Sequence, residues 1–224
     1  MGSNVSALAE SLISLGSEVR QVRKARGQTL KDLSKLAGIS VSHLSAIERG
    51  TTNPSFEIVH KLAVALGISA DWFFARRSGS GPLERAYVVR RQNRRNLNTL
   101  YGEGIASLGL SDELLSSSIG GSFFMGLAVY EPQSSRPGHP MYQHDGEQHG
   151  YILKGRLQLQ IGDELIELNE GDSYSFPTTI LHNARNVTDE ACELIWSISP
   201  VTIPKDVVVP EPQQRPAGKT AKRT

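Results

Sequence analysis

Two histidines and several oxygen-bearing side chains lie close together in the segment YQHDGEQHGYILKG, residues 142–155, and a further histidine, His182, follows in GDSYSFPTTILHNARN. Neutral imidazole binds divalent transition metals and also hydrogen-bonds organic molecules. The neighbouring Gln148 carries a neutral amide and Tyr142 a phenol that ionises near pH 10, so both are poor metal ligands. These residue types predict a polar binding site, which is either a metal centre or a cavity for an organic ligand.

Strand patterns surround these residues. The segments SFFMGLAVYEP, SYSF and CELIWSIS are apolar or alternating, and RLQLQIGDELIEL predicts a hairpin that turns at Gly162-Asp163. Neighbouring side chains on a strand point to opposite faces, so His149 is expected to point away from Gln148. Short strands joined by glycine-containing turns predict a jelly-roll or small barrel between residues 122 and 198.

The spacing of Gly171, Pro177, His182 and Asn186 resembles the second cupin motif, with Thr179 where glycine is usual. If Gly155 ends the first cupin motif, the remaining ligand positions of the family fall on Tyr142, His144 and Gln148. Two of the four ligand positions, His144 and His182, therefore match the family pattern, and Tyr142 and Gln148 depart from it. The departures favour a ligand pocket formed by Tyr142, His144, Gln148 and His182. No cofactor is required, and a divalent metal on His144 and His182 is the alternative.

Residues 16–75 read as five short helices. Thr29 with Asp32 predicts a helix start, with Leu30, Leu33, Leu36 and Ala37 as its apolar stripe, and Gly38 predicts its end. Ser40 is the expected N-cap of the next helix, in which Val41, Leu44 and Ile47 point inward. The last two helices are SFEIVHKLAVALG and SADWFFA.

Residues 19–74 resemble the Cro-repressor-type helix-turn-helix family, through TLKDLSKLAGIS followed by IERG and NPS. The resemblance implies that the second helix of the motif enters the major groove of DNA, where short polar side chains contact bases and nearby residues contact phosphates. The expected DNA-binding residues are Thr29, Ser40, Ser42, His43, Ser45, Arg49, Thr51 and Asn53.

Some residues near this motif have structural interpretations. The resemblance pairs Glu48 with Arg23 or Arg26, and Trp72, Phe73 and Phe74 are expected in the core. Arg90, Arg91, Arg94 and Arg95 lie in an arginine-rich segment, 85–95. They are interpreted as contacts to the DNA backbone, as a solvated face or as a subunit contact.

Charge is segregated along the 224 residues. The net charge is only +1, yet residues 1–77 carry +4 and residues 100–204 carry −10. A basic N-terminal part indicates a polyanionic partner. No apolar run is long enough for a membrane span, no secretory signal is seen, and the lone Cys192 is expected in the core of a cytoplasmic protein.

The chain is therefore expected to be α+β in two domains, an all-α helix-turn-helix domain and an all-β cupin barrel. The expected boundaries are a flexible N-terminus at 1–15, the DNA-binding domain at 16–77, a linker at 78–100, the cupin domain at 101–204 and a disordered basic tail at 205–224.

This combination resembles bacterial transcriptional regulators and implies a non-enzymatic homodimer that binds operator DNA and senses a small-molecule effector. A metal-dependent cupin dioxygenase or isomerase fused to a DNA-binding module is the main alternative. A constitutive architectural DNA-binding protein is the third.

Overall fold

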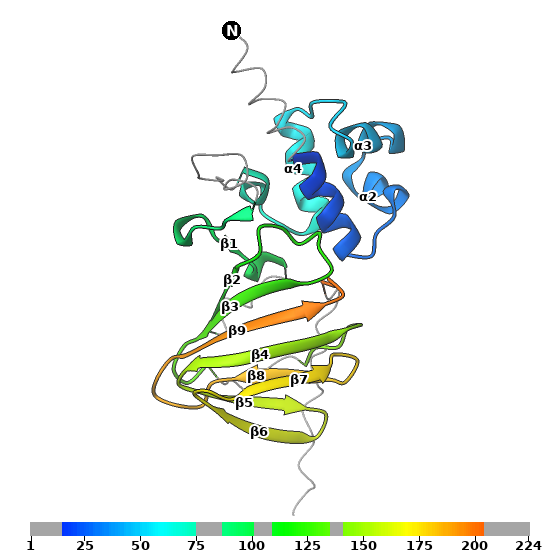
Figure 1. The fold of residues 1–224 in the computed structure, drawn as a ribbon. Helices are drawn as coiled ribbons and strands as arrows, with labels where there is room; N and C mark the ends of the chain where they lie inside the picture. Colours follow the sequence, from blue (N-terminus) through cyan, green and yellow to red (C-terminus); the bar gives the residue numbers. More distant parts are fainter. Residues whose placement is uncertain (1–14, 75–86, 101–108, 135–140, 204–224) are drawn as a thin grey trace, which may run out of the picture.

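The computed structural model describes residues 15–74, 87–100, 109–134 and 141–203. The helices form one end of the molecule and the strands form the other (Figure 1). Within the described residues, no helix is long and apolar enough to cross a membrane. Residues 1–14 of the expected flexible N-terminus at 1–15, residues 78–86 of the expected linker at 78–100, and the expected tail at 205–224 lie outside the described residues.

The helical domain contains a helix over 15–25, α2 (Leu30–Ala37), α3 (Val41–Glu48) and α4 (Phe56–Leu66). The turn between α2 and α3 follows from Gly38, whose φ of +66° ends α2 in the left-handed conformation. The fifth predicted helix is a short 3-10 helix, η1 (Ala70–Phe74).

A buried ion pair fixes the base of α3. Arg23 donates to both carboxylate oxygens of Glu48, at 2.6 and 2.9 Å, and this confirms the first of the two expected partners. Leu33, Leu44 and Leu62 are fully buried and belong to the same hydrophobic core. The Arg23–Glu48 pair joins α3 to the helix over 15–25.

Three residues depart from their predicted burial. Leu36 is 62% exposed, Val41 44% and Phe74 52%, whereas Trp72 is buried as expected. A helix of eight residues buries a narrow stripe, so Leu36 and Val41, at the edge of that stripe, remain accessible to solvent. Cys192 is fully buried, which confirms its expected core position.

The strand domain begins with β1 (Arg95–Asn96) and β2 (Leu110–Leu114) and continues through β3 (Phe124–Tyr130), β4 (Glu147–Lys154), β5 (Arg156–Ile161), β6 (Glu164–Asn169), β7 (Ser173–Pro177), β8 (His182–Arg185) and β9 (Cys192–Ser199). The predicted hairpin is β5 and β6, and Gly162 turns it with a φ of +58°. Two 3-10 turns, η2 (Arg91–Asn93) and η3 (Asn98–Leu100), flank β1, and η2 lies in the arginine-rich segment, 85–95.

Two antiparallel sheets face each other. One has the order β1-β2-β3-β9-β4-β7 and the other β6-β5-β8. The inward residues of the long sheet include Phe124, Trp196 and Ile152, and those of the short sheet include Leu157 and Leu159, all buried. The two-domain α+β architecture expected from the sequence is therefore present.

The domains touch through Arg95. Its guanidinium donates to Glu18 on the first helix at 2.7 Å and to the carbonyl oxygen of Ser117 at 2.8 Å, and it lies 4.7 Å from the ring centre of Trp72. Arg94 pairs with Glu113 on β2 at 3.1 Å. These two arginines hold the protein's own parts together, which none of the three interpretations from the sequence included.

Candidate functional site

The helix-turn-helix surface is organised by two capping hydroxyl groups. Thr29 accepts from the amide of Asp32 at 3.2 Å and its hydroxyl donates to the Asp32 carboxylate at 2.6 Å. Ser40 accepts from the amide of His43 at 3.2 Å. Both residues were predicted to contact DNA, and in the structure their side chains start α2 and α3.

The remaining predicted DNA-contacting residues lie on or just after α3. Ser42, Arg49, Thr51 and Asn53 are exposed, and His43 and Ser45 are half-buried. The guanidinium of Arg49 donates to the hydroxyl of Ser45, and the Thr51 hydroxyl donates to the carbonyl oxygen of Ala46 at 3.1 Å. These contacts keep the polar residues of α3 and the following loop on one face.

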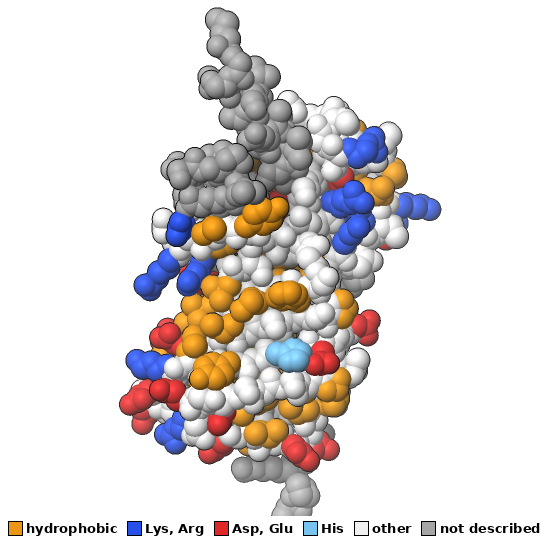
Figure 2. All heavy atoms as spheres, in the orientation of Figure 1, with side chains coloured by type: hydrophobic (Ala, Val, Ile, Leu, Met, Phe, Trp, Pro, Cys, Tyr) orange, Lys and Arg blue, Asp and Glu red, His pale blue; other side chains and the backbone are white. Residues whose placement is uncertain are grey.

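Positively charged side chains lie on the same domain as this polar face. Lys and Arg side chains gather over the helical domain near α2 and α3, whereas Asp and Glu side chains are spread over the strands (Figure 2). Exposed Lys31 and Lys35 lie on α2. A basic surface around a helix with short polar side chains provides the electrostatic and hydrogen-bonding groups that bind duplex DNA.

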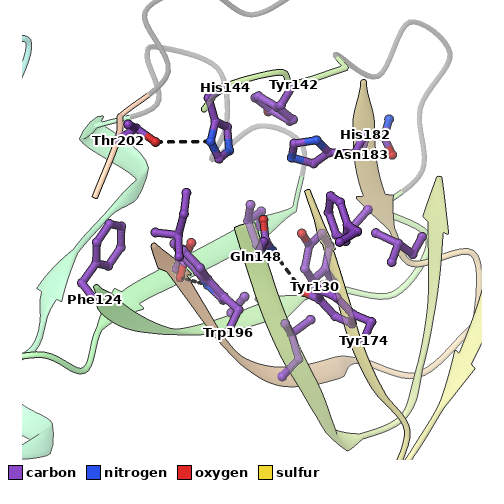
Figure 3. Close-up of a pocket in the computed structure, with 18 residues that line it drawn as sticks. Phe124, Tyr130, Tyr142, His144, Gln148, Tyr174, His182, Asn183, Trp196 and Thr202 are labelled. Atoms are coloured by element: carbon purple, nitrogen blue, oxygen red, sulfur yellow. Dashed lines mark hydrogen bonds between the residues drawn. The ribbon is translucent and has the colours of Figure 1, made fainter. Parts of the chain in front are cut away.

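The second site is a cavity of about 120 Å³ between the two sheets (Figure 3). The four residues predicted to form a pocket, Tyr142, His144, Gln148 and His182, all line it. Tyr142 and His182 exchange backbone hydrogen bonds of 2.7 and 2.9 Å, which brings the segment before β4 next to β8. The imidazoles of His144 and His182 are 5.4 Å apart.

Backbone carbonyl groups orient both imidazoles. Nδ1 of His144 is 3.1 Å from the carbonyl oxygen of Asp145, and Nδ1 of His182 is 2.8 Å from that of Ile180. Since a carbonyl oxygen only accepts, each Nδ1 carries the proton and each Nε2 is a hydrogen-bond acceptor. Burial lowers the pKa of both histidines, so both are neutral at pH 7.

The other predicted ligands do not complete a metal site. Burial raises the pKa of Tyr142 to about 12, which disfavours the phenolate that a metal would need. The amide nitrogen of Gln148 donates to the hydroxyl of Tyr174 at 3.1 Å. In the described part of the chain, no three His, Cys, Asp or Glu side chains are grouped to hold a metal ion. Because no carboxylate in the described residues is grouped with the two imidazoles, they do not match the ligand set of the cupin family.

Several pocket residues were not predicted from the sequence. They are Asp112, Tyr130, Tyr174, Trp196 and Thr202, among others on β2, β3, β7, β9 and the segment after β9. The alternation of the strands predicts which of their side chains point inward. Only the pairing of β2 with β3 and of β3 with β9 brings Asp112 to Trp196, whose Nε1 donates to Oδ1 of Asp112 at 3.0 Å.

Comparison with known proteins gives two family matches. Residues 19–73 match the helix-turn-helix family and residues 126–198 match the cupin domain family. The HTH-type transcriptional regulator PuuR of Escherichia coli is 26% identical over 188 residues, which cover 84% of this chain and 95% of PuuR. The regulator SinR of Bacillus subtilis is 39% identical over 56 residues, which cover 25% of this chain and 50% of SinR.

Solved structures add a weaker likeness. An HTH_3 family transcriptional regulator from Vibrio cholerae aligns with a TM-score of 0.39 and 19% identity, over 85% of this chain and 97% of the other. The two family matches and the PuuR alignment cover both sites described above. The chain is therefore a DNA-binding transcriptional regulator that joins a helix-turn-helix domain to a cupin domain.

Proposed function

We propose that this regulator senses a small organic molecule in its cupin pocket, and that occupancy of the pocket changes its affinity for operator DNA. The observation that carries the proposal is the short path between the two sites. Thr202 lines the pocket, and the next residue, Ile203, donates its backbone amide to the carbonyl oxygen of Ala25 at the end of the first helix, at 3.0 Å. A ligand that favours one arrangement of this segment shifts the population of DNA-binding states.

The proposal needs neither catalysis nor a metal. The alternative, a metal-dependent cupin enzyme, requires a metal with open coordination positions for substrate. The raised pKa of Tyr142 and the neutral amide of Gln148 oppose such a centre. Protein purified without added metal is therefore expected to bind an effector. An effector response that disappears with a chelator and returns with Fe²⁺ or Zn²⁺ would favour the enzyme-like alternative.

We also propose that the regulator acts in the cytoplasm as a homodimer on an inverted repeat. One helix-turn-helix module buries only about 600–1,000 Å² on DNA, which is little for a tight specific complex. The outer face of the long sheet offers a surface for a second copy. Strand pairing places Leu127 of β3 beside Ile195 of β9, and Ile195 beside Tyr151 of β4. Leu127 and Ile195 are half-buried, and Tyr151 is 48% exposed.

Figure 2 shows hydrophobic side chains across this part of the sheet. A two-fold symmetric dimer binds an inverted repeat when its two recognition helices reach half-sites about 34–36 Å apart. The acidic cupin surface and the basic helical surface then have separate roles, because only the helical surface faces the phosphates.

The decisive experiment has two stages. The full-length protein is first used to select its operator from random duplex oligonucleotides. The operator affinity is then measured by fluorescence anisotropy against small molecules that raise the melting temperature of the protein. We expect at least one stabilising molecule to change operator affinity, by roughly 5–150-fold for ordinary coupling energies. Pocket ligands that leave operator affinity unchanged would disprove the sensor role.

A further inference from the structure

The cupin pocket contains a buried carboxyl group. Asp112 on β2 is 3% exposed and lines the cavity. Its Oδ1 accepts from Nε1 of Trp196 at 3.0 Å. Among the described residues that line the cavity, no lysine or arginine balances a negative charge on this carboxyl group. A buried carboxylate is stable only when a positive charge or several hydrogen bonds compensate it. With no such residue in the described cavity wall, Asp112 either holds a proton or pairs with a cationic ligand.

Aromatic rings surround the same space. Phe124, Tyr130, Tyr174, Phe176 and Trp196 line the cavity. Phe124 and Trp196 meet edge to face with ring centres 5.3 Å apart, and Tyr174 and Phe176 lie 5.9 Å apart. The faces of such rings carry negative potential and attract organic cations, especially where water is excluded. A carboxyl group among aromatic faces is a combination that recognises a cation with an apolar body.

Three further polar atoms of the cavity wall are acceptors. Nε2 of His144 and of His182 each carry a lone pair, because their Nδ1 protons are donated to carbonyl groups. Oδ1 of Asn183, in the same wall, has no hydrogen-bond partner among the described residues. Acceptors fit a ligand that brings N–H donors. An anionic ligand would face a carboxyl group without a lysine or arginine to hold it.

The volume of the cavity limits the size of the ligand. The cavity measures about 120 Å³. A protein cavity of about 150 Å³ holds benzene. A ligand that fits without moving the walls therefore has about five or six non-hydrogen atoms.

We propose that the cupin pocket binds a compact organic cation, with Asp112 as its counter-ion and the rings of Phe124, Tyr130 and Trp196 around its apolar part. This inference rests on the proposed sensor function, because it names the chemical class of the effector. Asp112 is then the residue that determines the charge specificity of the pocket.

Three probes of similar size and different charge test the proposal: n-butylammonium, 1-butanol and butyrate. Their affinities for the full-length protein are measured by isothermal titration calorimetry at pH 7.5. We expect n-butylammonium to bind about tenfold or more tightly than 1-butanol, and butyrate to show no binding, because charge-assisted hydrogen bonds are about twice as strong as neutral ones. Equal affinity for n-butylammonium and 1-butanol, or binding of butyrate, overturns the proposal.

A pair of variants assigns the effect to Asp112. Asp112→Asn removes the charge and keeps an acceptor for Trp196, and it is expected to weaken n-butylammonium about tenfold while 1-butanol is unaffected. The matched control is Glu164→Gln, which removes an exposed carboxylate on β6, outside the cavity. An unchanged affinity of Asp112→Asn for n-butylammonium shows that the Asp112–Trp196 pair is structural only, and overturns the proposal.

The unmodified protein supplies a measurement if Asp112→Asn does not fold. Burial raises the pKa of Asp112 to about 8, while the hydrogen bond from Trp196 lowers it. The groups that act on Asp112 are Tyr130 on β3, Tyr174 on β7 and Glu113 on β2, and none is basic. A cation binds the ionised form, so n-butylammonium affinity should rise about tenfold per pH unit up to pH 8 and then level off. A flat profile overturns the role of Asp112.

The outcomes separate this proposal from the sensor function. If n-butylammonium binds through Asp112 but no bound cation changes operator affinity, the ligand class stands and the sensor function fails. If an uncharged molecule binds the pocket and changes operator affinity, the sensor function stands, and the proposal that the effector is a cation is wrong.

Discussion

The amide of Ile203 donates a hydrogen bond to the carbonyl oxygen of Ala25 at 3.0 Å, and this bond joins the segment after the last strand to the end of the first helix. The preceding residue, Thr202, donates its hydroxyl to the carbonyl oxygen of Asp145 at 2.9 Å and lies 3.3 Å from Nδ1 of His144. Under the proposed sensor function, a shift of His144 on ligand binding would reach the DNA-binding domain through two adjacent residues, Thr202 and Ile203.

Removing the Thr202 hydroxyl should weaken this coupling. Thr202→Val keeps the branched shape and loses the two hydroxyl contacts. One hydrogen bond contributes about 1 kcal/mol, so the effector-dependent change in operator affinity should fall about fivefold. Operator affinity is measured by fluorescence anisotropy with and without saturating effector, whose binding is followed separately by calorimetry. Thr202→Ser, which keeps the hydroxyl, is expected to respond like the unmodified protein. An equal response of the Val variant would remove Thr202 from the path.

The sequence predicts local features better than long-range ones. Gly38, the Ser40 cap and the β5–β6 hairpin each depend on a few neighbouring residues, and the structure has all three. The four predicted pocket residues were identified through the resemblance to two cupin motifs, and the bridge between Tyr142 and His182 brings the two motifs together. Asp112 reaches the same pocket only through the pairing of β2, β3 and β9, which no residue of β2 specifies by itself.

Arg95 illustrates the same limit. From its composition, an arginine-rich segment indicates a polyanionic partner or a solvated face. Composition does not show that Arg95 pairs with a residue 77 positions earlier in the chain, Glu18. The side chains of Arg95 and Glu18 are only 11% and 5% exposed, so their pairing is an internal feature of the folded chain. The low exposure of both side chains, and not the net charge of the segment, shows that Arg95 has a structural role.

Arg95→Met should destabilise the contact between the domains. Breaking a buried ion pair costs about 3–5 kcal/mol, and this variant also loses the cation–π contact with Trp72. We expect urea denaturation to separate into two transitions, one for each domain. The exposed neighbour Arg91 provides the control, since Arg91→Met should unfold as the unmodified protein does. A single unshifted transition for Arg95→Met would show that the domains do not depend on this pair.

His43 on α3 is expected to read a base. His43→Ala should weaken binding to the selected operator by about 1–3 kcal/mol and relax the preference at one base pair. His60 is exposed and lies on α4, outside the two helices of the motif, α2 and α3. His60→Ala therefore serves as the matched control. Both variants are tested by a repeated oligonucleotide selection and by anisotropy at two salt concentrations. An unchanged base preference in His43→Ala would show that His43 contacts only the backbone or solvent.

The apolar patch on the long sheet is expected to hold the dimer together. Leu127→Glu puts a charge at the centre of the patch, which an apolar interface excludes, so the variant should be monomeric by light scattering at micromolar concentration. Its operator affinity should fall because the two half-sites are then bound independently. Leu165→Glu, at a 50% exposed leucine on the other sheet, should leave the mass unchanged. A dimeric Leu127→Glu protein would place the interface on another surface.

The buried carboxyl group of Asp112 should make stability depend on pH. Its pKa is about 8 in the folded protein and near 4 in the unfolded chain, so the folded state retains a proton that the unfolded state loses. A raised folded pKa contributes stability at low pH that is lost as the pH rises from about 4 to 8. Asp112→Asn lacks this loss, so relative to the unmodified protein it should gain a few kcal/mol between pH 5 and pH 8.5. Melting temperatures across this range measure the difference, with Glu164→Gln as the control. A constant difference between Asp112→Asn and the unmodified protein at all pH values would show that Asp112 is ionised in the folded protein without a ligand.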